Sequence, residues 1–218
     1  MHKSINNLIE IKSKLKTISK KKHSLPNIIA VSKTFPIDKI FPLIEYGHIH
    51  FGENKIQEAN YKWPKIKEKY PNIKLHMLGK VQSNKVKFLL PLFDYIHSLD
   101  NLKLAKLISN MQVKYKFKPK IFIQVNVGNE SQKSGIAENE LEYFYKKCTI
   151  DLNLDIIGLM CIPPVDGNTK NFFLLLKNCS DKLGLENLSM GMSHDYQEAA
   201  MCGSTFIRIG TAIFGARN

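Results

Sequence analysis

The sequence contains little arginine, few cysteines and no long apolar segment, and each absence limits what the protein can be. None of its apolar runs approaches the ~20 residues that a membrane-spanning helix needs, and the first residues lack the apolar core of a secretion signal. We therefore expect a cytoplasmic protein with no membrane partner. Cys148, Cys161, Cys179 and Cys202 form no Cys-x-x-Cys pair, which argues against a zinc site and a disulfide framework. Reduced, structural thiols and no bound metal are expected.

The positive charge comes almost entirely from lysine. The formal net charge is +13, but arginine occurs only at Arg208 and Arg217. Arginine is the side chain best suited to bidentate recognition of phosphates and base edges, so a specific nucleic-acid partner is not expected. The same scarcity makes Arg208 informative, because it lies inside an apolar segment of a chain that otherwise uses lysine. This indicates that the planar guanidinium itself is required there.

Short apolar runs alternate with helical stretches along the chain. After a helix expected at residues 4–19, strands are expected at 28–31, 48–51, 75–78, 94–98, 121–127, 155–160, 187–189 and 205–209. Helices are expected between them, at 37–46, 53–62, 80–90, 101–114, 138–149, 169–183 and 195–202. Strict alternation implies parallel strands joined by helices. The pattern predicts an α/β protein, a single (β/α)8 TIM-type barrel with an extra N-terminal helix, spanning residues 1–218 as one domain.

An open doubly wound sheet is the alternative fold, although no Gly-x-Gly-x-x-Gly follows the first strand.

Two small-residue turns follow the last two expected strands, Gly-Met-Ser at 191–193 and Gly-Thr at 210–211. Barrels of this kind often hold phosphate in these two loops. Unpaired N–H groups at a helix start attract an anion, and glycine lets it come close to the backbone. The two turns therefore predict a site for a phosphorylated small molecule.

Strand parity adds a lysine to this site. Side chains alternate between the two faces of a strand, so if Val31 points into the barrel, Lys33 does too and emerges at the catalytic end. The same rule groups Phe206 with Arg208, and Ile156 and Gly158 with Met160. A lysine beside a phosphate site can form a Schiff base with a phosphorylated aldehyde, of which pyridoxal 5'-phosphate is the commonest cofactor. Burial would supply the neutral amine that this reaction needs.

Other polar residues offer competing interpretations. His48 and His50 share a spacing that can bind metal, but without a third ligand we expect helix-facing or solvated side chains. His76 and His97 are expected to be hydrogen-bonded core residues. Lys133 is a candidate second amine, although a solvated loop lysine is the simpler interpretation. A cofactor-free phosphate-sugar isomerase would need a carboxylate base at a strand end, for which Glu53 and Asp100 are the candidates.

Several motifs, in order and at matching spacing, resemble those of a known family. They lie at 30–34 (Ala-Val-Ser-Lys-Thr), 51–58, 78–85, 133–135, 158–160, 188–195 and 203–215. On these motifs the chain resembles the pyridoxal phosphate homeostasis proteins, single-domain relatives of the alanine racemase barrel. The resemblance implies that pyridoxal 5'-phosphate is the cofactor and that Lys33 carries it as a Schiff base. Further contacts are implied to the phosphate, by Ser193, Gly210 and Thr211, and to the ring, by Asn54 and Met160.

Arg208 has two possible roles under this resemblance. It would approach either the pyridine ring nitrogen or the edge of the phosphate, and the sequence leaves both open. At the nitrogen, a permanent cation would keep that atom unprotonated and make the ring a weaker electron sink.

The resemblance also bears on whether the protein is a catalyst. A racemase with two bases needs a second proton-transfer group, usually a tyrosine from an additional β-domain, and the sequence contains no such domain. We therefore expect a non-catalytic protein of vitamin B6 homeostasis that holds pyridoxal phosphate and passes it to apo-enzymes. The alternative is a pyridoxal-phosphate-dependent, racemase-like enzyme with the same barrel.

Overall fold

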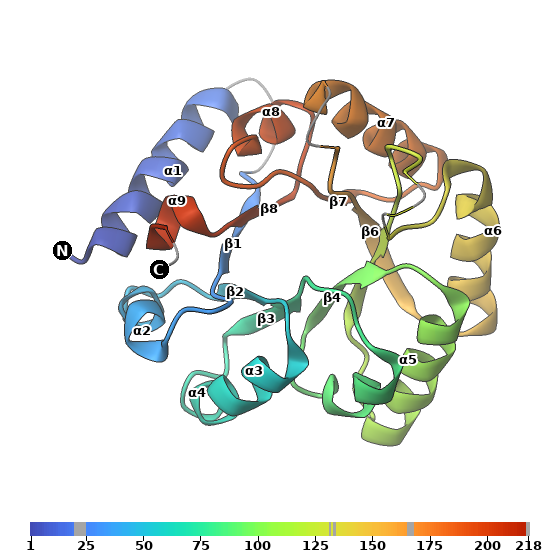
Figure 1. The fold of residues 1–218 in the computed structure, drawn as a ribbon, viewed down its shortest axis with the longest axis horizontal. Coiled ribbons are helices and arrows are strands. Elements are labelled where there is room, and N and C mark those ends of the chain that lie inside the picture. The colour runs from blue at the N-terminus through green and yellow to red at the C-terminus, as the bar shows by residue number, and fades with distance from the viewer. Residues whose placement is uncertain (20–24, 131, 133, 165–167, 217–218) are drawn as a thin grey trace.

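A computed structural model describes residues 1–19, 25–130, 132, 134–164 and 168–216 of the chain. Its strands form a closed parallel barrel in the order of the sequence, with helices around the outside (Figure 1). The strands are β1 (Asn27–Val31), β2 (His50–Glu53), β3 (Lys74–Met77), β4 (Tyr95–Leu99), β5 (Lys120–Gln124), β6 (Asp155–Met160), β7 (Asn187–Ser189) and β8 (Phe206–Ile209). The predicted (β/α)8 barrel is confirmed, and the open sheet is wrong, because β8 pairs with β1.

The helices cover the outer face of the barrel. They are α1 (Lys3–Ser19), α2 (Ile37–Glu45), α3 (Ile56–Lys62), α4 (Pro64–Lys69), α5 (Leu102–Tyr115), α6 (Leu141–Lys146), α7 (Thr169–Lys182), α8 (Tyr196–Met201) and α9 (Thr211–Phe214). The extra helix α1 buries Leu8, Ile11 and Leu15 and packs against α8 and α9. In the described part of the chain, none of the helices combines the length and apolarity needed to cross a membrane.

Some predicted boundaries were wrong. Residues 80–90 form only a short 3₁₀ helix, η1 (Ser83–Phe88), because Ser83 and Asn84 are poor helix formers and Pro91 blocks extension. β2 ends at Glu53, so α3 begins three residues later than expected at Ile56. The segment 138–149 divides into a 3₁₀ turn η2 (Glu138–Glu140), α6 and a π-helical turn η3 (Lys147–Asp151).

Two groups of apolar side chains lie on opposite sides of the strands. The larger one fills the space between the barrel and the helices and includes Ala30, Phe51, Trp63 and Ile207. The smaller one lies inside the barrel and consists of Ile29, Phe122, Met160 and Phe206, with Leu78, Tyr95 and Ile157 packed against it. Residues of the second group come from strands all around the barrel, so its interior is packed with side chains rather than open.

The predicted grouping of Ile156 with Met160 was wrong. Ile156 belongs to the outer core and Met160 to the barrel interior. Between β5 and β6 the register passes from Ile121–Ile156 to Phe122–Gly158, which leaves Ile157 as an extra residue. Such a bulge reverses the alternation of side chains, and a sequence pattern does not reveal it.

Candidate functional site

The ends of β1 and β8 bring the predicted lysine and the second small-residue turn together. Ile29 of β1 is the register partner of Arg208 on β8, and a Cβ added to Gly210 would lie 3.6 Å from Val31. Lys33 follows Val31 by two residues and is half-buried. The carboxyl ends of these neighbouring strands therefore place Lys33 beside the Gly210 turn, as the sequence predicts.

The loop after β7 joins this site through Ser193. The Ser193 Oγ accepts hydrogen bonds from the backbone N–H groups of Gly210 and Ala212, both at 3.3 Å. Asp195 fixes the loop, because its Oδ1 accepts from the N–H of Met192 at 2.5 Å. Gly191 has a φ of +92°, and a Cβ there would lie 2.5 Å from the Cβ of Ala199, so this turn requires glycine. The two predicted phosphate turns thus form one structure.

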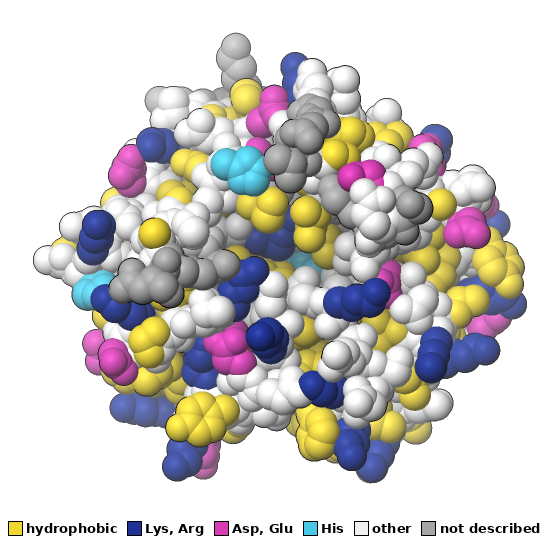
Figure 2. All heavy atoms as spheres, in the orientation of Figure 1, with side chains coloured by type: hydrophobic (Ala, Val, Ile, Leu, Met, Phe, Trp, Pro, Cys, Tyr) yellow, Lys and Arg dark blue, Asp and Glu magenta, His cyan; other side chains and the backbone are white. Residues whose placement is uncertain are grey.

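Exposure at this end differs from residue to residue. Ser193 is half-buried and Thr211, the first residue of α9, is exposed. Figure 2 shows lysine and arginine side chains bordering the hollow near the middle of the face that it presents.

Arg208 is held deep inside the barrel. Its Nη1 donates to the carbonyl oxygen of Ser189 at 2.6 Å and to the Ser189 Oγ at 2.7 Å, and its Nη2 donates to the carbonyl of Cys161 at 2.8 Å. Burial lowers the pKa of the guanidinium. Among the described residues no carboxylate forms an ion pair with it. Among the same residues its Nε has no hydrogen-bond acceptor either.

Asn54 and Met160 approach the site from other strands. Met160, the last residue of β6, lies in the barrel interior and is almost fully buried. Asn54 follows β2 and is half-buried. A Cβ on Gly79 would lie 2.2 Å from the Asn54 carbonyl oxygen, so only glycine allows the loop after β3 to approach Asn54 this closely.

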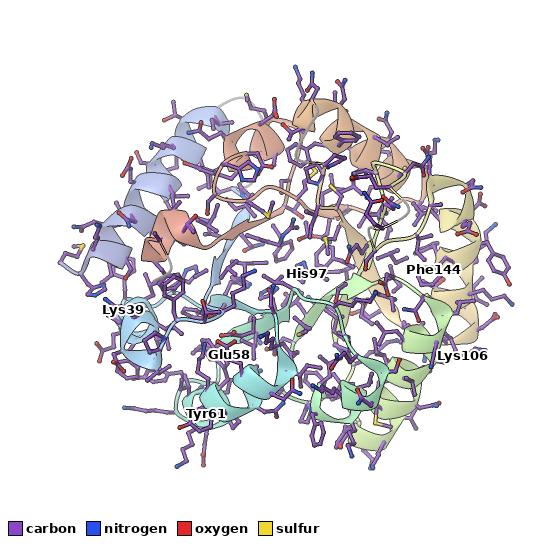
Figure 3. All side chains as sticks on the ribbon, viewed as in Figure 1. Lys39, Glu58, Tyr61, His97, Lys106 and Phe144 are labelled. Atoms are coloured by element: carbon purple, nitrogen blue, oxygen red, sulfur yellow. The ribbon has the colours of Figure 1, made fainter. Side chains whose placement is uncertain are left out.

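A network beside Lys33 was not predicted from the sequence. Thr34 has a φ of +67°, a left-handed conformation that is strained for a β-branched residue. Its N–H donates to Glu58 Oε1 at 2.7 Å, and Glu58 also pairs with Lys62 at 3.0 Å. Figure 3 shows Glu58 on the inner side of α3, whereas Tyr61 of the same helix lies at the outer edge. The motif at 51–58 contained Glu58, but a spacing cannot reveal a backbone contact with Thr34.

The two carboxylates considered for an isomerase, Glu53 and Asp100, accept hydrogen bonds from neighbouring side chains. Oε1 of buried Glu53 accepts from Ser32 Oγ at 2.8 Å, Trp63 Nε1 at 2.9 Å and Lys62 Nζ at 2.9 Å. Asp100 accepts from the side chain of Asn101 at 2.6 Å. Glu53 is thus directed towards the helices and not into the barrel, and this geometry does not favour the isomerase.

Histidines line the barrel interior below Arg208. His50, His76 and His97 form a hydrogen-bonded row that ends on Ser189. His76 and His97 are confirmed as hydrogen-bonded core residues, whereas half-buried His50 does not face the helices, because its ring contacts Tyr95 and Phe206 inside the barrel. Strand β2 begins at His50, so His48, which was expected to belong to this strand, lies just before it.

The last residues to consider are the four cysteines, Lys133 and Arg217. All four cysteines are free and buried, and desolvation raises the pKa of Cys148 and Cys161 to about 12. Within the described ranges no group of three or more His, Cys, Asp or Glu side chains could hold a metal ion. Lys133 and Arg217 lie outside the described residues.

Comparison with known proteins gives a consistent result. Residues 7–218 match the alanine racemase N-terminal domain family. The pyridoxal phosphate homeostasis protein of Pasteurella multocida is 36% identical over 210 residues, which is 92% of this chain and 90% of that protein. PipY of Synechococcus elongatus, solved without pyridoxal phosphate, is 31% identical, with a TM-score of 0.88 over 98% of this chain and 100% of that one.

PipY has also been solved with pyridoxal phosphate bound, and that structure aligns with a TM-score of 0.82 over 94% of this chain and 100% of that one. Alanine racemase from Corynebacterium glutamicum shares the fold, with 15% identity and a TM-score of 0.71 over 97% of this chain and 62% of the racemase. The chain therefore belongs to the alanine racemase N-terminal domain family and, within it, to the pyridoxal phosphate homeostasis proteins.

Proposed function

We propose that this protein binds pyridoxal 5'-phosphate covalently through Lys33 and acts in pyridoxal phosphate homeostasis. The observation that carries the proposal is the meeting of Lys33, the Ser193 loop and the Gly210 turn at the carboxyl ends of β1, β7 and β8. The name of the Pasteurella multocida relative and the ligand in the PipY structure support it.

The residues at this end fit the chemical parts of the cofactor. Ser193, Gly210 and Thr211 would hold the phosphate, since hydroxyl and backbone N–H donors at a helix start favour an anion. Asn54 and Met160 would lie along the ring. When bound, the cofactor supplies an aldehyde that condenses with a primary amine, and Lys33 Nζ would provide that amine. Residues 1–218 would act as one pyridoxal-phosphate-binding barrel.

The state of Arg208 supports a role at the ring nitrogen rather than at the phosphate. Its guanidinium bonds to Ser189 and Cys161, inside the barrel, whereas Ser193 organises the Gly210 turn above it. The Nε–H without an acceptor in the described residues matches an unprotonated pyridine nitrogen, which accepts one hydrogen bond. A cation that cannot give up its proton at neutral pH would keep that nitrogen unprotonated.

We further propose that the protein is a carrier and not a racemase. A racemase needs a second proton-transfer group close to Lys33, commonly a tyrosine. The tyrosines of this chain lie on or beside helices, except Tyr95, which is at the amino end of β4, the opposite end of the barrel. A carrier that restrains a reactive aldehyde would deliver it to apo-enzymes, which are the proposed partners.

The test compares Lys33→Ala with Lys39→Ala, a matched change at an exposed lysine on the outer helix α2 (Figure 3). We expect the wild type and Lys39→Ala to take up one equivalent of pyridoxal phosphate and turn yellow, and Lys33→Ala to lose the yellow absorbance. Circular dichroism checks that all three are folded. Equal uptake by all three, or no uptake by any, would overturn the proposed site. Robust racemisation of amino acids that disappears in Lys33→Ala would overturn the carrier role.

A further inference from the structure

A continuous row of hydrogen bonds crosses the barrel interior and ends on Arg208. His50 Nδ1 lies 2.9 Å from His76 Nε2, and His76 Nδ1 lies 2.9 Å from His97 Nε2. His97 Nδ1 lies 2.8 Å from Ser189 Oγ, which accepts from Arg208. The row begins at the first residue of β2 and climbs to β8, two residues before the Gly210 turn. It connects the two ends of the barrel.

Aromatic rings enclose the two inner histidines of the row, His76 and His97. His76 stacks on Tyr95 with a centroid distance of 4.3 Å, and His97 stacks on Phe122 at 4.4 Å. Phe206 packs against all three histidines. His76 and His97 are fully buried, and Figure 3 places His97 near the centre of the ring of strands. Desolvation lowers the pKa of both well below the usual value, so both rings are neutral.

The guanidinium determines the direction of the row. A neutral imidazole has one donor and one acceptor nitrogen, and a guanidinium can only donate. Since Ser189 Oγ already accepts from Arg208, its hydroxyl proton needs an acceptor, and His97 Nδ1 is the one within reach among the described residues. His97 must then donate from Nε2 to His76, and His76 from Nε2 to His50. The reverse direction would leave the Ser189 proton without an acceptor in the described part of the chain.

We propose that Ser189 and His97 are positioning residues for Arg208, and that the row of three Nε2-protonated histidines holds its guanidinium in one orientation. The inference deepens the proposed function, because this guanidinium would face the ring of pyridoxal phosphate. Because the hydrogen bonds of the row can run in only one direction, Ser189 Oγ accepts from Arg208 Nη1 in a single arrangement. The Nε–H is then held in one position as well.

The first test needs neither a variant nor the cofactor. Histidine ring nitrogens in the ¹⁵N-labelled protein report tautomer and charge directly. We expect His50, His76 and His97 to be neutral Nε2–H tautomers at pH 7. A cationic ring or an Nδ1–H tautomer at any of the three would overturn the proposal.

The second test reads the guanidinium itself. With only two arginines in the chain, ¹⁵N-arginine labelling leaves Arg208 to be distinguished from Arg217 alone. We expect separate, slowly exchanging Nη signals for Arg208 in the wild type and averaged signals in Ser189→Ala. Ser180→Ala is the matched control, because it removes a buried serine hydroxyl on α7 that bonds to Leu185. Unchanged Nη signals in Ser189→Ala would overturn the proposal.

A pair of variants separates positioning from packing. His97→Asn retains an acceptor for Ser189 near the Nδ1 position, whereas His97→Leu removes it and keeps a similar volume. We expect His97→Leu to average the Nη signals and to weaken pyridoxal phosphate binding roughly tenfold, and His97→Asn to preserve both. Equal behaviour of the two variants would mean a merely structural role. Failure of the proposed function is distinct, since it would appear as no uptake of pyridoxal phosphate by a wild type with an intact row.

Discussion

Polar side chains are arranged differently in the two halves of the barrel, the lower half, which contains the histidine row, and the mouth at the carboxyl ends of the strands. In the lower half, from His50 to Ser189, the side chains hydrogen-bond to one another, and His76 and His97 stack on aromatic rings. At the mouth, Lys33, Ser193 and Thr211 are partly or fully accessible and are arranged by backbone turns. An enclosed polar group needs partners within the protein, whereas an accessible one can also contact solvent or a ligand. The lower half therefore stabilises the barrel, and the mouth is available for binding.

The largest expected difference between the halves appears on acidification. Burial lowers the pKa of His50 to about 4 and those of His76 and His97 well below 6.5, and it lowers the pKa of His48, which contacts Phe51 of the outer core, to about 3. Unfolded histidines titrate near 6.5, so the stability they contribute is complete above that pH and is lost as the pH falls towards the folded values. Each of these histidines should lower the free energy of unfolding by about 1.4 kcal/mol per pH unit below 6.5. Urea unfolding at several pH values measures this slope.

His48→Gln tests the assignment of this slope. The variant takes up one proton fewer on unfolding and should flatten the profile without interrupting the row inside the barrel. An acid profile equally steep in this variant, or no loss of stability between pH 6.5 and 4.5, would contradict the buried, neutral state.

The next effect comes from breaking the row at its centre. His97→Leu leaves His76 Nδ1 and the Ser189 hydroxyl without their partner, and each unsatisfied buried group costs about 1–3 kcal/mol. We expect the free energy of unfolding to fall by about 2–4 kcal/mol. A loss below 0.5 kcal/mol, on the scale of an ordinary surface change, would show that the lower half does not carry the stability assigned to it.

A change at the mouth should affect binding and not stability. Ser193→Ala removes the hydroxyl that joins the two turns through long, half-exposed hydrogen bonds of 3.3 Å. We expect unfolding to change by less than about 1 kcal/mol and pyridoxal phosphate binding to weaken roughly tenfold. Ser180→Ala serves again as control. If Ser193→Ala destabilises the protein as much as His97→Leu, the division between the halves is wrong.

The smallest effect concerns the strained residue beside Lys33. Thr34→Gly removes a β-branched side chain from a left-handed conformation. The relief of strain stabilises the folded state by about 1 kcal/mol, and the greater conformational freedom of glycine in the unfolded state offsets part of this gain. The midpoint of thermal unfolding should rise slightly or stay unchanged. A clear fall would show that the Thr34 side chain contributes contacts that exceed its strain.

The sequence predicted the barrel because each strand and helix carries a local pattern. Residues 155–160 and 187–189 were expected as strands and form them with the same limits. Helix α4 was missed because Pro64 reads as a helix breaker, although proline is well tolerated at the first helical position. The bulge at Ile157 was missed because it arises from pairing between β5 and β6.

The site was predictable where it depends on order along the chain. Loops after the first, seventh and eighth strands of a barrel meet at one end, so Lys33, Ser193 and Gly210 could be placed together. The row from His50 to Arg208 could not be predicted, because its members lie on five strands and their contacts depend on register and tilt. The scarcity of arginine identified Arg208, but its partners Ser189 and Cys161 have no distinguishing pattern.

The central claim, that Lys33 at the mouth holds pyridoxal phosphate, is tested most directly by borohydride reduction of the protein incubated with the cofactor, followed by peptide mapping. Reduction fixes the cofactor to the amine that carries it, in a chain where lysine supplies nearly all of the positive charge. We predict a single major adduct on the peptide containing Lys33, lost in Lys33→Ala and kept in Lys39→Ala. Adducts spread over many lysines, or one dominant adduct elsewhere, would contradict the account.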